Sequence, residues 1–385
     1  RPVDLLSFEG ISTLSFNKDF SQCVVSHKDK NLYIYKVTNI KESSKWILLH
    51  TLKSHFEYIS SVDWHPETNK IISGSYDKNI YVWQYNESKQ KWLPELVVFN
   101  SKLSILTVKW SPNGEKFVAG AGGCRVIVGY FSDENNWWKG EEFKFHKSAV
   151  TSVSFDPSGI YVIAGSTDLK ISIHSAFLEW SKNDSKDHKI YFPQEHNKAK
   201  FKSFVFEHKV GAWVNDVAFS PDGKYSFALG HDSTLVTVNN LTLSPNTIRC
   251  RHQSCNSIVP LSNNKIILIG FDRHFYLYEL KGEVWEYSKD ITVEGSSSAN
   301  NNETNTPKAK GTENVNDGKK NSIFDRMKMF DEQHQMKKSS ILATDNKNTG
   351  ISTEKMHNAN ISSFSSCKGK LITSDLAGFV KEWVV

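Results

Sequence analysis

Short runs in which every second residue is hydrophobic recur along the whole chain. The clearest series is HFEYISSVDWHPETNKIISGSYDKNIYVWQY, residues 55–85. In it ISSVDW, KIISGS and IYVWQY each predict a β-strand, and HPETN and YDKN predict the turns between them. The repeating unit of this chain is therefore strand, turn, strand, tight turn, strand.

This unit occurs seven times. Three further clear copies are residues 103–131, 149–175 and 213–239, and three weaker copies are residues 11–37, 255–280 and 360–385. Several copies are followed by a fourth apolar run, such as KWILLHTL, KWLPELVVF or EFKFH. Four strands repeated about every 45 residues are typical of propeller blades, each of which buries its faces against its neighbours. The sequence predicts one all-β domain, a seven-bladed propeller over residues 1–385.

The last copy ends at Val385, directly after its third predicted strand. The apolar run VDLLSFE, about residues 3–9, precedes the first copy and has no other predicted partner. We expect it to supply the fourth strand of the last blade, because this closes the ring and leaves no open sheet edge. Removal of the first ten residues should then destabilise the whole domain.

An aspartate occupies the same place in the tight turn of five copies. These residues are Asp29, Asp77, Asp168, Asp232 and Asp272. In residues 55–85 we expect His55, either Ser73 or Ser75, Asp77 and Trp83 to form a buried hydrogen-bonded chain that ties the turns of the blade together. Backbone N–H groups satisfy a carboxylate in a tight turn. We therefore interpret these side chains as structural, and we predict no catalytic residue among them.

A long insert, residues 295–356, separates the sixth copy from the seventh and fits no blade. Residues 295–321 are rich in Asn, Ser, Gly and Lys and predict a disordered tether, and residues 339–356 predict a second linker. Between them, residues 322–338 predict an amphipathic helix. Ser322 is its expected N-cap, and two lysines at its end suit the helix dipole.

The apolar stripe of this helix must be covered by something, because a helix of about 15 residues is marginal alone in water. The stripe comprises Ile323, Met327, Phe330 and His334, with Phe324 at its edge. Two interpretations remain open. The helix docks on its own propeller, or it binds a partner with Ile323, Met327 and Phe330 as anchors.

Composition excludes several other classes of protein. The 38% hydrophobic and 23% charged residues are typical of a globular domain, and 47 basic against 42 acidic residues give a net charge of +5 without the basic stripe that nucleic acid requires. An acidic protein partner is compatible with this charge. No apolar run approaches the roughly 18 residues of a membrane span, so no membrane insertion is expected.

Metal and enzyme chemistry have little support in the sequence. The five cysteines are irregularly spaced, which favours a reducing compartment, and Cys250-x4-Cys255 with His252 between them lacks a second ligand pair. Gly-x-Ser-x-Gly, His-Glu-x-x-His and Walker motifs are absent, and GAGGC has no following helix to bind phosphate. We predict no enzyme, no metal site and no cofactor.

The connection AFLEWSKNDSKDHKIYFPQEHNKAKFKSF, placed between the fourth and fifth blades, mixes lysine and histidine with aromatic residues. We interpret it either as a solvated loop followed by an outer strand or as a subunit interface.

The repeats resemble WD-repeat propellers, with Trp83-Gln84 and Trp383-Val384 in place of the Trp-Asp pair. A closer resemblance, to the WD-repeat subunits of the actin-related protein 2/3 complex, rests on DWHPETNKIISGSYDKNIYVW, YFSDENNWW, GAWVNDVAFS with GHDSTL, and FDRMKMFDEQHQMKKSS. It runs nearly end to end. That complex nucleates branched actin filaments.

This resemblance implies a non-enzymatic core subunit that packs against other subunits and helps to hold an actin-related protein. It also implies binding of the acidic tail of nucleation-promoting factors, contact of the inserted helix with the actin filament, and a cytoplasmic location in cortical actin patches or the leading edge. The alternative is a peptide-recognising WD-repeat adaptor, such as a ubiquitin ligase substrate receptor. It would bind its ligand on the narrow face and would need no tethered helix.

Overall fold

Strands dominate the computed structural model, which describes residues 10–38, 45–100, 103–181, 183–184, 191–197, 199–294, 361–367, 370–375 and 380–384. Two short helical segments accompany them, a 3-10 turn at Gln194–His196 and the helix α1 (Ile291–Glu294). No helix of the described residues is long and apolar enough to cross a bilayer.

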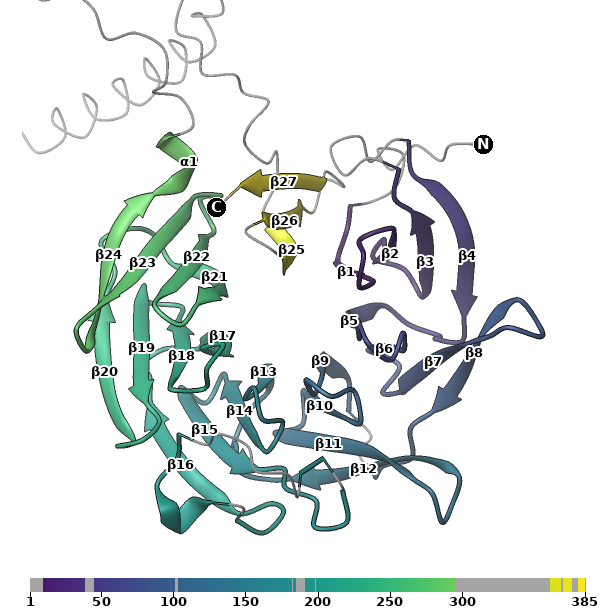
Figure 1. Ribbon diagram of the computed structural model, residues 1–385, viewed down its shortest axis with the longest axis horizontal. Helices are drawn as coiled ribbons and strands as arrows, with labels where there is room; N and C mark the ends of the chain where they lie inside the picture. Colours follow the sequence, from purple (N-terminus) through teal and green to yellow (C-terminus); the bar gives the residue numbers. More distant parts are fainter. Residues whose placement is uncertain are drawn as a thin grey trace, which may run out of the picture. The chain divides into compact units, whose positions relative to one another are not determined.

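The described strands form seven antiparallel sheets, six with four strands and one with three (Figure 1). The first sheet contains β1 (Thr13–Phe16), β2 (Gln22–Ser26), β3 (Asn31–Lys36) and β4 (Ile47–Lys53). The second contains β5 (Ile59–Trp64), β6 (Ile71–Ser75), β7 (Ile80–Asn86) and β8 (Lys91–Leu96). The third contains β9 (Ile105–Trp110), β10 (Lys116–Ala121), β11 (Arg125–Ser132) and β12 (Trp137–Phe143). The fourth contains β13 (Val150–Phe155), β14 (Tyr161–Ser166), β15 (Lys170–Ser175) and β16 (Phe204–Lys209).

The remaining sheets repeat this order. The fifth contains β17 (Val214–Phe219), β18 (Tyr225–Gly230), β19 (Thr234–Asn239) and β20 (Ser244–Arg249). The sixth contains β21 (Cys255–Ser262), β22 (Lys265–Gly270), β23 (Phe275–Lys281) and β24 (Val284–Asp290). The seventh contains β25 (Ile361–Cys367), β26 (Lys370–Asp375) and β27 (Val380–Val384).

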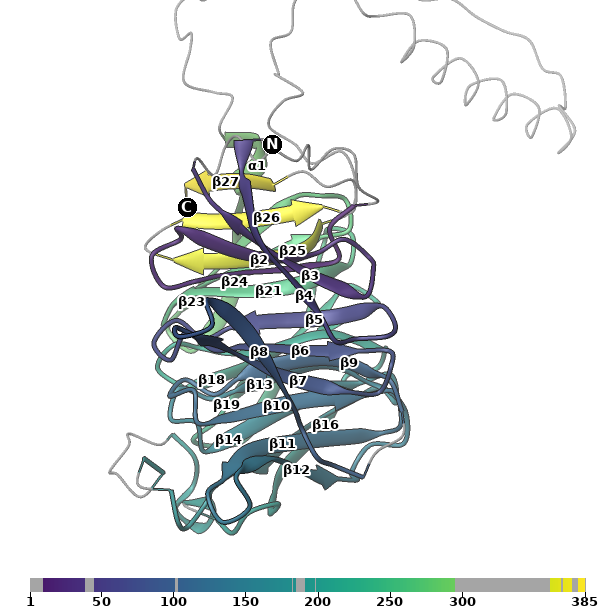
Figure 2. The same ribbon diagram turned by 90° about the vertical axis from the view of Figure 1, so that its right-hand side faces the viewer.

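The sheets are arranged around a ring, as Figure 1 shows. The first strands of successive sheets contact one another from β1 to β21, and β25 of the seventh sheet contacts β1 of the first. Seen from the side, the strands run between two faces of the ring (Figure 2). This arrangement is a seven-sheet β-propeller.

Burial changes from the second strand of each sheet to the fourth. Every residue of β6, β10, β14 and β18 is buried, whereas most residues of β8 and β20 are exposed. The second strand of a sheet is covered by a neighbouring sheet on each of its two faces. Its sequence is therefore a nearly continuous apolar run. The fourth strand lies at the rim and alternates or turns polar, which is why its sequence signal is weak.

Close packing between sheets requires a glycine at one place in three second strands. A Cβ atom on Gly74 would lie 2.5 Å from a side-chain atom of Ile105, and one on Gly165 would lie 2.4 Å from Val214. Gly120 approaches Val150 in the same way, at 2.8 Å. The partner in each case is a residue in the first strand of the following sheet, so these glycines set how closely neighbouring sheets pack.

The fold agrees with the predicted all-β, seven-bladed propeller, with two differences of detail. The fourth strand of the third sheet is β12, Trp137–Phe143, and not the later run EFKFH. The long connection after Ser175 lies inside the fourth sheet, between β15 and β16, because β16 is the outer strand of that sheet. The expected closing strand at residues 3–9 and the insert, residues 295–356, lie outside the described residues.

Candidate interaction surfaces

A hydrogen-bonded chain of side chains joins two turns of the second sheet. His55 Nδ1 lies 2.8 Å from Asp77 Oδ2, and His55 Nε2 lies 2.8 Å from Ser73 Oγ. The indole N–H of Trp83 donates to the same Ser73 oxygen at 2.9 Å. The Ser75 hydroxyl bonds only backbone groups among the described residues: it is shared between the carbonyl oxygens of Glu57 and Tyr58, and it accepts from the Asp77 N–H at 3.1 Å.

Asp77 also caps the backbone of both turns. It accepts hydrogen bonds from the N–H groups of Phe56 and Asn79, each at 2.9 Å. Burial raises the pKa of Asp77, but the hydrogen bonds from His55 and Phe56 outweigh it, and the net pKa is below its usual value. A carboxylate with this many donors holds a turn and has little freedom to transfer protons.

The fourth sheet contains a variant of the same chain. His146 Nδ1 lies 3.1 Å from Asp168 Oδ2, and its Nε2 lies 2.8 Å from Ser172 Oγ. In this sheet the residue at the place of Ser73 is Ala164. Ser172 lies directly opposite Ala164, on the third strand. Burial lowers the pKa of His146 despite the neighbouring Asp168.

The other three predicted aspartates serve their own turns. Asp29 accepts from the Tyr33 hydroxyl at 2.7 Å, and Asp232 accepts from the Thr234 hydroxyl at 2.6 Å. Asp272 accepts from the Tyr276 hydroxyl and, at 3.1 Å, from the N–H of His274. The five aspartates therefore lie in equivalent turns of different sheets, and they do not converge on one site.

The remaining predicted residues divide into two groups. The stripe of the predicted insert helix lies outside the described residues. Its members are Ile323, Phe324, Met327, Phe330 and His334. In the other group, the Cys255 thiol lies 3.6 Å from His252 Nδ1, and burial raises its pKa. No group of three or more His, Cys, Asp or Glu side chains suited to a metal ion occurs among the described residues.

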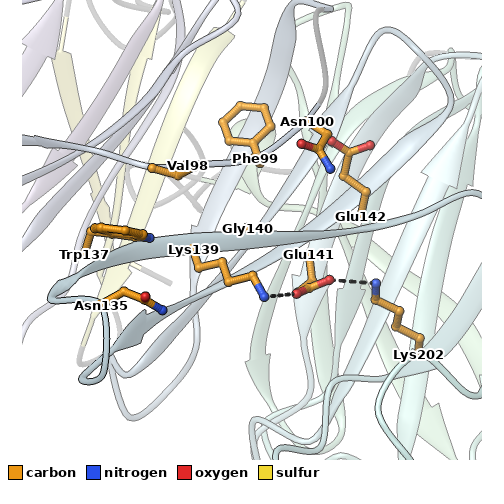
Figure 3. Close-up of a pocket in the computed structure, with 10 residues that line it drawn as sticks. All are labelled: Val98, Phe99, Asn100, Asn135, Trp137, Lys139, Gly140, Glu141, Glu142 and Lys202. Carbon is orange, nitrogen blue, oxygen red and sulfur yellow. Dashed lines mark hydrogen bonds and ion pairs between the residues drawn. The ribbon is translucent and has the colours of Figure 1, made fainter.

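A groove of about 440 Å³ lies on the rim of the third sheet (Figure 3). Its lining residues are Val98, Phe99, Asn100, Asn135, Trp137, Lys139, Gly140, Glu141, Glu142 and Lys202. Val98 follows β8 and bridges the outer edge of β12: its N–H donates to the Trp138 carbonyl at 2.9 Å, and its carbonyl accepts from Gly140 at 2.8 Å. The rims of the second and third sheets are thus connected here.

The charged groups of this groove hold one another in place. Glu141 accepts from Lys139 at 2.6 Å and from Lys202 at 3.0 Å, as Figure 3 shows. Burial raises the pKa of Glu141, but the two lysines more than compensate and the net pKa is lowered. Beside them the Trp137 side chain is 46% exposed. An exposed indole is a side chain that binding hot spots favour, and the described lining holds no Ser, Cys or His to act as a nucleophile.

A buried ion pair attaches the long β15–β16 connection to the third sheet. Lys116 Nζ, at the start of β10, lies 2.5 Å from Asp184 Oδ2 and donates to the Ala176 carbonyl at 3.0 Å. Asp184 also accepts from the Leu178 N–H at 2.8 Å. Burial lowers the pKa of Lys116, although Asp184 opposes this shift.

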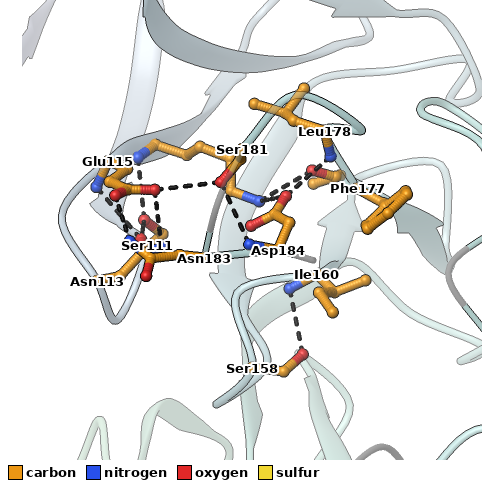
Figure 4. A network of polar contacts seen from close by, with 12 residues as sticks. Ser111, Asn113, Glu115, Ser158, Ile160, Phe177, Leu178, Ser181, Asn183 and Asp184 are labelled. Carbon is orange, nitrogen blue, oxygen red and sulfur yellow. Dashed lines mark hydrogen bonds and ion pairs between the residues drawn. The ribbon is translucent and has the colours of Figure 1, made fainter. Parts of the chain in front are cut away.

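A second, exposed layer of contacts lies beside this pair (Figure 4). The Ser181 hydroxyl donates to Glu115 at 3.2 Å, and the Asn183 amide donates to the other oxygen of Glu115. Between these anchors Trp180 is 64% exposed, with its ring 5.4 Å from the ring of Tyr130. The described part of the connection is therefore attached to the ring and presents an indole at its surface. The sequence pattern did not reveal this pair, because Asp184 lies far along the chain from Lys116.

Comparison with known proteins agrees with the fold. The WD domain, G-beta repeat family matches residues 46–84, 139–175 and 200–239. Actin-related protein 2/3 complex subunit 1A of Arabidopsis thaliana is 29% identical over 304 residues, covering 77% of this chain and 78% of that protein. Subunit 1A-A of Xenopus laevis is 28% identical over 269 residues (69% and 70%), and subunit 1 of Saccharomyces cerevisiae is 27% identical over 199 residues (51% of each).

The ring of antiparallel sheets and the matched repeats define a WD-repeat β-propeller. Within that class, the relatives from plants, frogs and yeasts carry one name. The chain is similar to subunit 1 of the actin-related protein 2/3 complex from these organisms.

Proposed function

We propose that this chain is a non-enzymatic scaffold subunit of an actin-related protein 2/3 complex and that it supports nucleation and branching of actin filaments. The observation that carries the proposal is similarity to subunit 1 proteins over about three quarters of the chain, 77% in the case of the plant protein. Their names state the complex to which they belong. It follows that this protein works in the cytoplasm, at the actin cytoskeleton.

A propeller suits a scaffold because its core keeps the surfaces in fixed positions. Fully buried second strands such as β6 and β14, and turns held by His55–Asp77 and His146–Asp168, leave little freedom within each sheet. On this frame, the rim groove with Trp137 and the β15–β16 connection with Trp180 are the surfaces that we assign to other subunits. Exposed aromatic side chains on rigid elements contribute binding energy at a low cost in conformational entropy.

The finer parts of the function concern two partners that the family resemblance implies. The predicted helix at residues 322–338 contacts the actin filament or an actin-related protein, with Ile323, Met327 and Phe330 as anchors. The acidic tail of a nucleation-promoting factor is the second partner. Full burial of the three anchors would contribute on the order of 5–9 kcal/mol, and ordering the segment takes back at least about 2–5 kcal/mol. The helix therefore strengthens an existing assembly and does not create one.

The role of the insert helix can be tested in a complex reconstituted with the Met327→Ser/Phe330→Ser double variant. We expect an intact complex in which filament branching, counted by fluorescence microscopy, is clearly reduced. Met329→Ser/Met336→Ser is the matched control, because both methionines lie off the predicted stripe. Branching that equals that of the unmodified complex would exclude the helix as a partner contact.

The competing function, a peptide-recognising adaptor of a ubiquitin ligase, predicts different partners. The reconstituted complex separates the two: the scaffold proposal requires that omission of this chain abolishes assembly or nucleation. An adaptor would leave actin nucleation by the remaining subunits unchanged.

A further inference from the structure

One face of the ring gathers two sets of turns from every four-stranded sheet. The order of the antiparallel strands places the hairpin between the second and third strands on the same side as the connection from the fourth strand to the next sheet. Because His55, Asp77, His146 and Asp168 lie in these turns, we call this side the His–Asp face. Figure 2 shows the strands running between this face and the opposite one.

Exposed cations lie on the His–Asp face of the first five sheets. They are Lys28, Lys30, Lys53, Lys78, Lys144, Lys147, Lys209 and Arg251. None of them forms an ion pair with another described residue, whereas Lys170 on the same face pairs with Glu207 at 2.5 Å. Glu57 is exposed beside Phe56. The lysines are therefore available to an anionic ligand.

Two aspartates of the same face, Asp77 and Asp168, are recessed and already occupied. Asp77 accepts from His55 and from two backbone N–H groups, and the Asp168 carboxylate accepts from the Lys147 N–H at 2.8 Å. The side chains of Asp77 and Asp168 are only 4% and 8% exposed, whereas the lysines are exposed. An approaching surface meets the cations first.

Large apolar side chains are exposed in several of the same turns. Phe56 is 76% exposed, Trp213 58%, Leu103 50% and Tyr76 46%. Phe56 and Tyr76 belong to the second sheet and Leu103 to the entry of the third, whereas Trp213 belongs to the entry of the fifth. They are thus distributed around the ring and do not line one cleft.

We propose that the His–Asp face docks peripherally on an anionic phospholipid membrane. Clusters of lysine near a surface of acidic lipids bind it electrostatically, and aromatic side chains prefer the membrane–water interface. The distribution favours a planar ligand over an acidic peptide, because cations and apolar tips are spread over several sheets. The two described grooves lie elsewhere, one on the rim and one beside the opposite turns at His65 and Ser111. The proposal goes beyond the scaffold function and does not depend on it.

Co-sedimentation with vesicles tests this proposal on the full-length chain. We expect binding to phosphatidylcholine vesicles that contain phosphatidylserine, little binding to phosphatidylcholine alone, and release by added salt. Lys53→Glu/Lys78→Glu should weaken binding about tenfold or more, because two cations near the surface are reversed. Phe56→Ser/Trp213→Ser should weaken it without a change in the salt dependence.

The matched control is Lys89→Glu/Lys91→Glu, which reverses two exposed lysines, one in the β7–β8 turn and one at the start of β8, on the opposite side of the ring. It should bind as the unmodified chain does. Thermal melts of all variants should coincide, because every altered side chain is exposed.

The proposal is overturned if the control loses as much vesicle binding as the Lys53/Lys78 variant, or if the chain fails to bind phosphatidylserine vesicles. Binding of a polyglutamate peptide without binding of vesicles would overturn it as well. Repeating the assay with the assembled complex must give the same dependence on Lys53 and Lys78; loss of binding there would also overturn it.

Discussion

Two sheets meet the same hydrogen-bonding requirement with serines from different strands. In the second sheet Ser73 on β6 accepts from the Trp83 N–H and is hydrogen-bonded to His55, and in the fourth sheet Ser172 on β15 is hydrogen-bonded to His146. Because Ser172 lies opposite the place of Ser73, the hydroxyl reaches nearly the same point. The geometry thus preserves the position of the hydroxyl and not the position of the serine in the sequence.

Ser73→Ala should destabilise the protein by about 1–3 kcal/mol, because it leaves the buried Trp83 N–H without an acceptor and His55 Nε2 without its hydroxyl partner. Urea denaturation followed by fluorescence measures the change in the midpoint. Ser88→Ala is the matched control, since Ser88 lies in an exposed turn and bonds only the nearby Asn86. Equal midpoints for Ser73→Ala and the unmodified protein would contradict the structural role of the chain.

In the fourth sheet, His174 is left without a hydrogen-bond partner in the described part of the chain because the serine lies on the third strand. It takes the place of Trp83 but has no serine to bond, and both of its ring nitrogens lack a hydrogen-bond partner among the described residues. The ring is fully buried and stacks on Phe145 at 3.8 Å. Burial lowers the pKa of His174 to about 3.

This histidine should make stability depend on pH. Between about pH 6.5 and about pH 3, His174 is protonated in the unfolded chain and neutral in the folded protein. The free energy of unfolding therefore falls as pH falls through this window. His174→Phe should flatten this dependence, and the exposed His231→Asn should not. Urea midpoints measured from pH 7 to pH 4.5 give the comparison; parallel curves for His174→Phe and the unmodified protein would contradict the assignment.

At the scale of elements, the buried Lys116–Asp184 pair determines where the β15–β16 connection lies. Lys116→Met should cost about 3–5 kcal/mol, because it leaves the Asp184 carboxylate buried without its cation. Limited proteolysis should then cleave between Ser175 and Phe204 at lower protease concentrations. Replacing Asp184 by Leu as well should restore part of the stability.

Lys18→Met, which removes the exposed pair with Glu67, is the control and should cost less than about 1 kcal/mol. A Lys116→Met protein as stable as the Lys18→Met protein would disprove the attachment.

The elements differ in how well the sequence predicts them. Runs such as KIISGS are apolar on both faces because both faces are covered, and they were predicted at the correct residues. For the outer strand of the third sheet, the sequence indicates EFKFH, whereas the strand is β12, WWKGEEF. A rim strand with charged residues on its exposed face has no apolar run that would locate it. The contacts of Lys116 with Asp184 and of Glu141 with Lys202 could not be predicted, since both partners lie in the distant β15–β16 connection and the pattern within one strand carries no information on them.

At the scale of the whole molecule, the first six sheets are buried against one another, which we expect to make them unfold together as one unit. Clusters of buried residues extend across sheet boundaries: Ile72 and Val82 of the second sheet pack with Val108 and Phe117 of the third. The surfaces that we assign to partners lie on the rim and the faces of this unit. A rigid ring of this kind holds those surfaces at fixed distances, which is what a scaffold requires.

The composition of the native assembly tests the central claim most directly. The tagged chain should be purified from its own cells under gentle conditions and its partners quantified by mass spectrometry. We predict actin-related proteins and the other subunits of their complex, in fixed stoichiometry with this chain. Recovery with ubiquitin ligase subunits, or without actin-related proteins, would contradict the account.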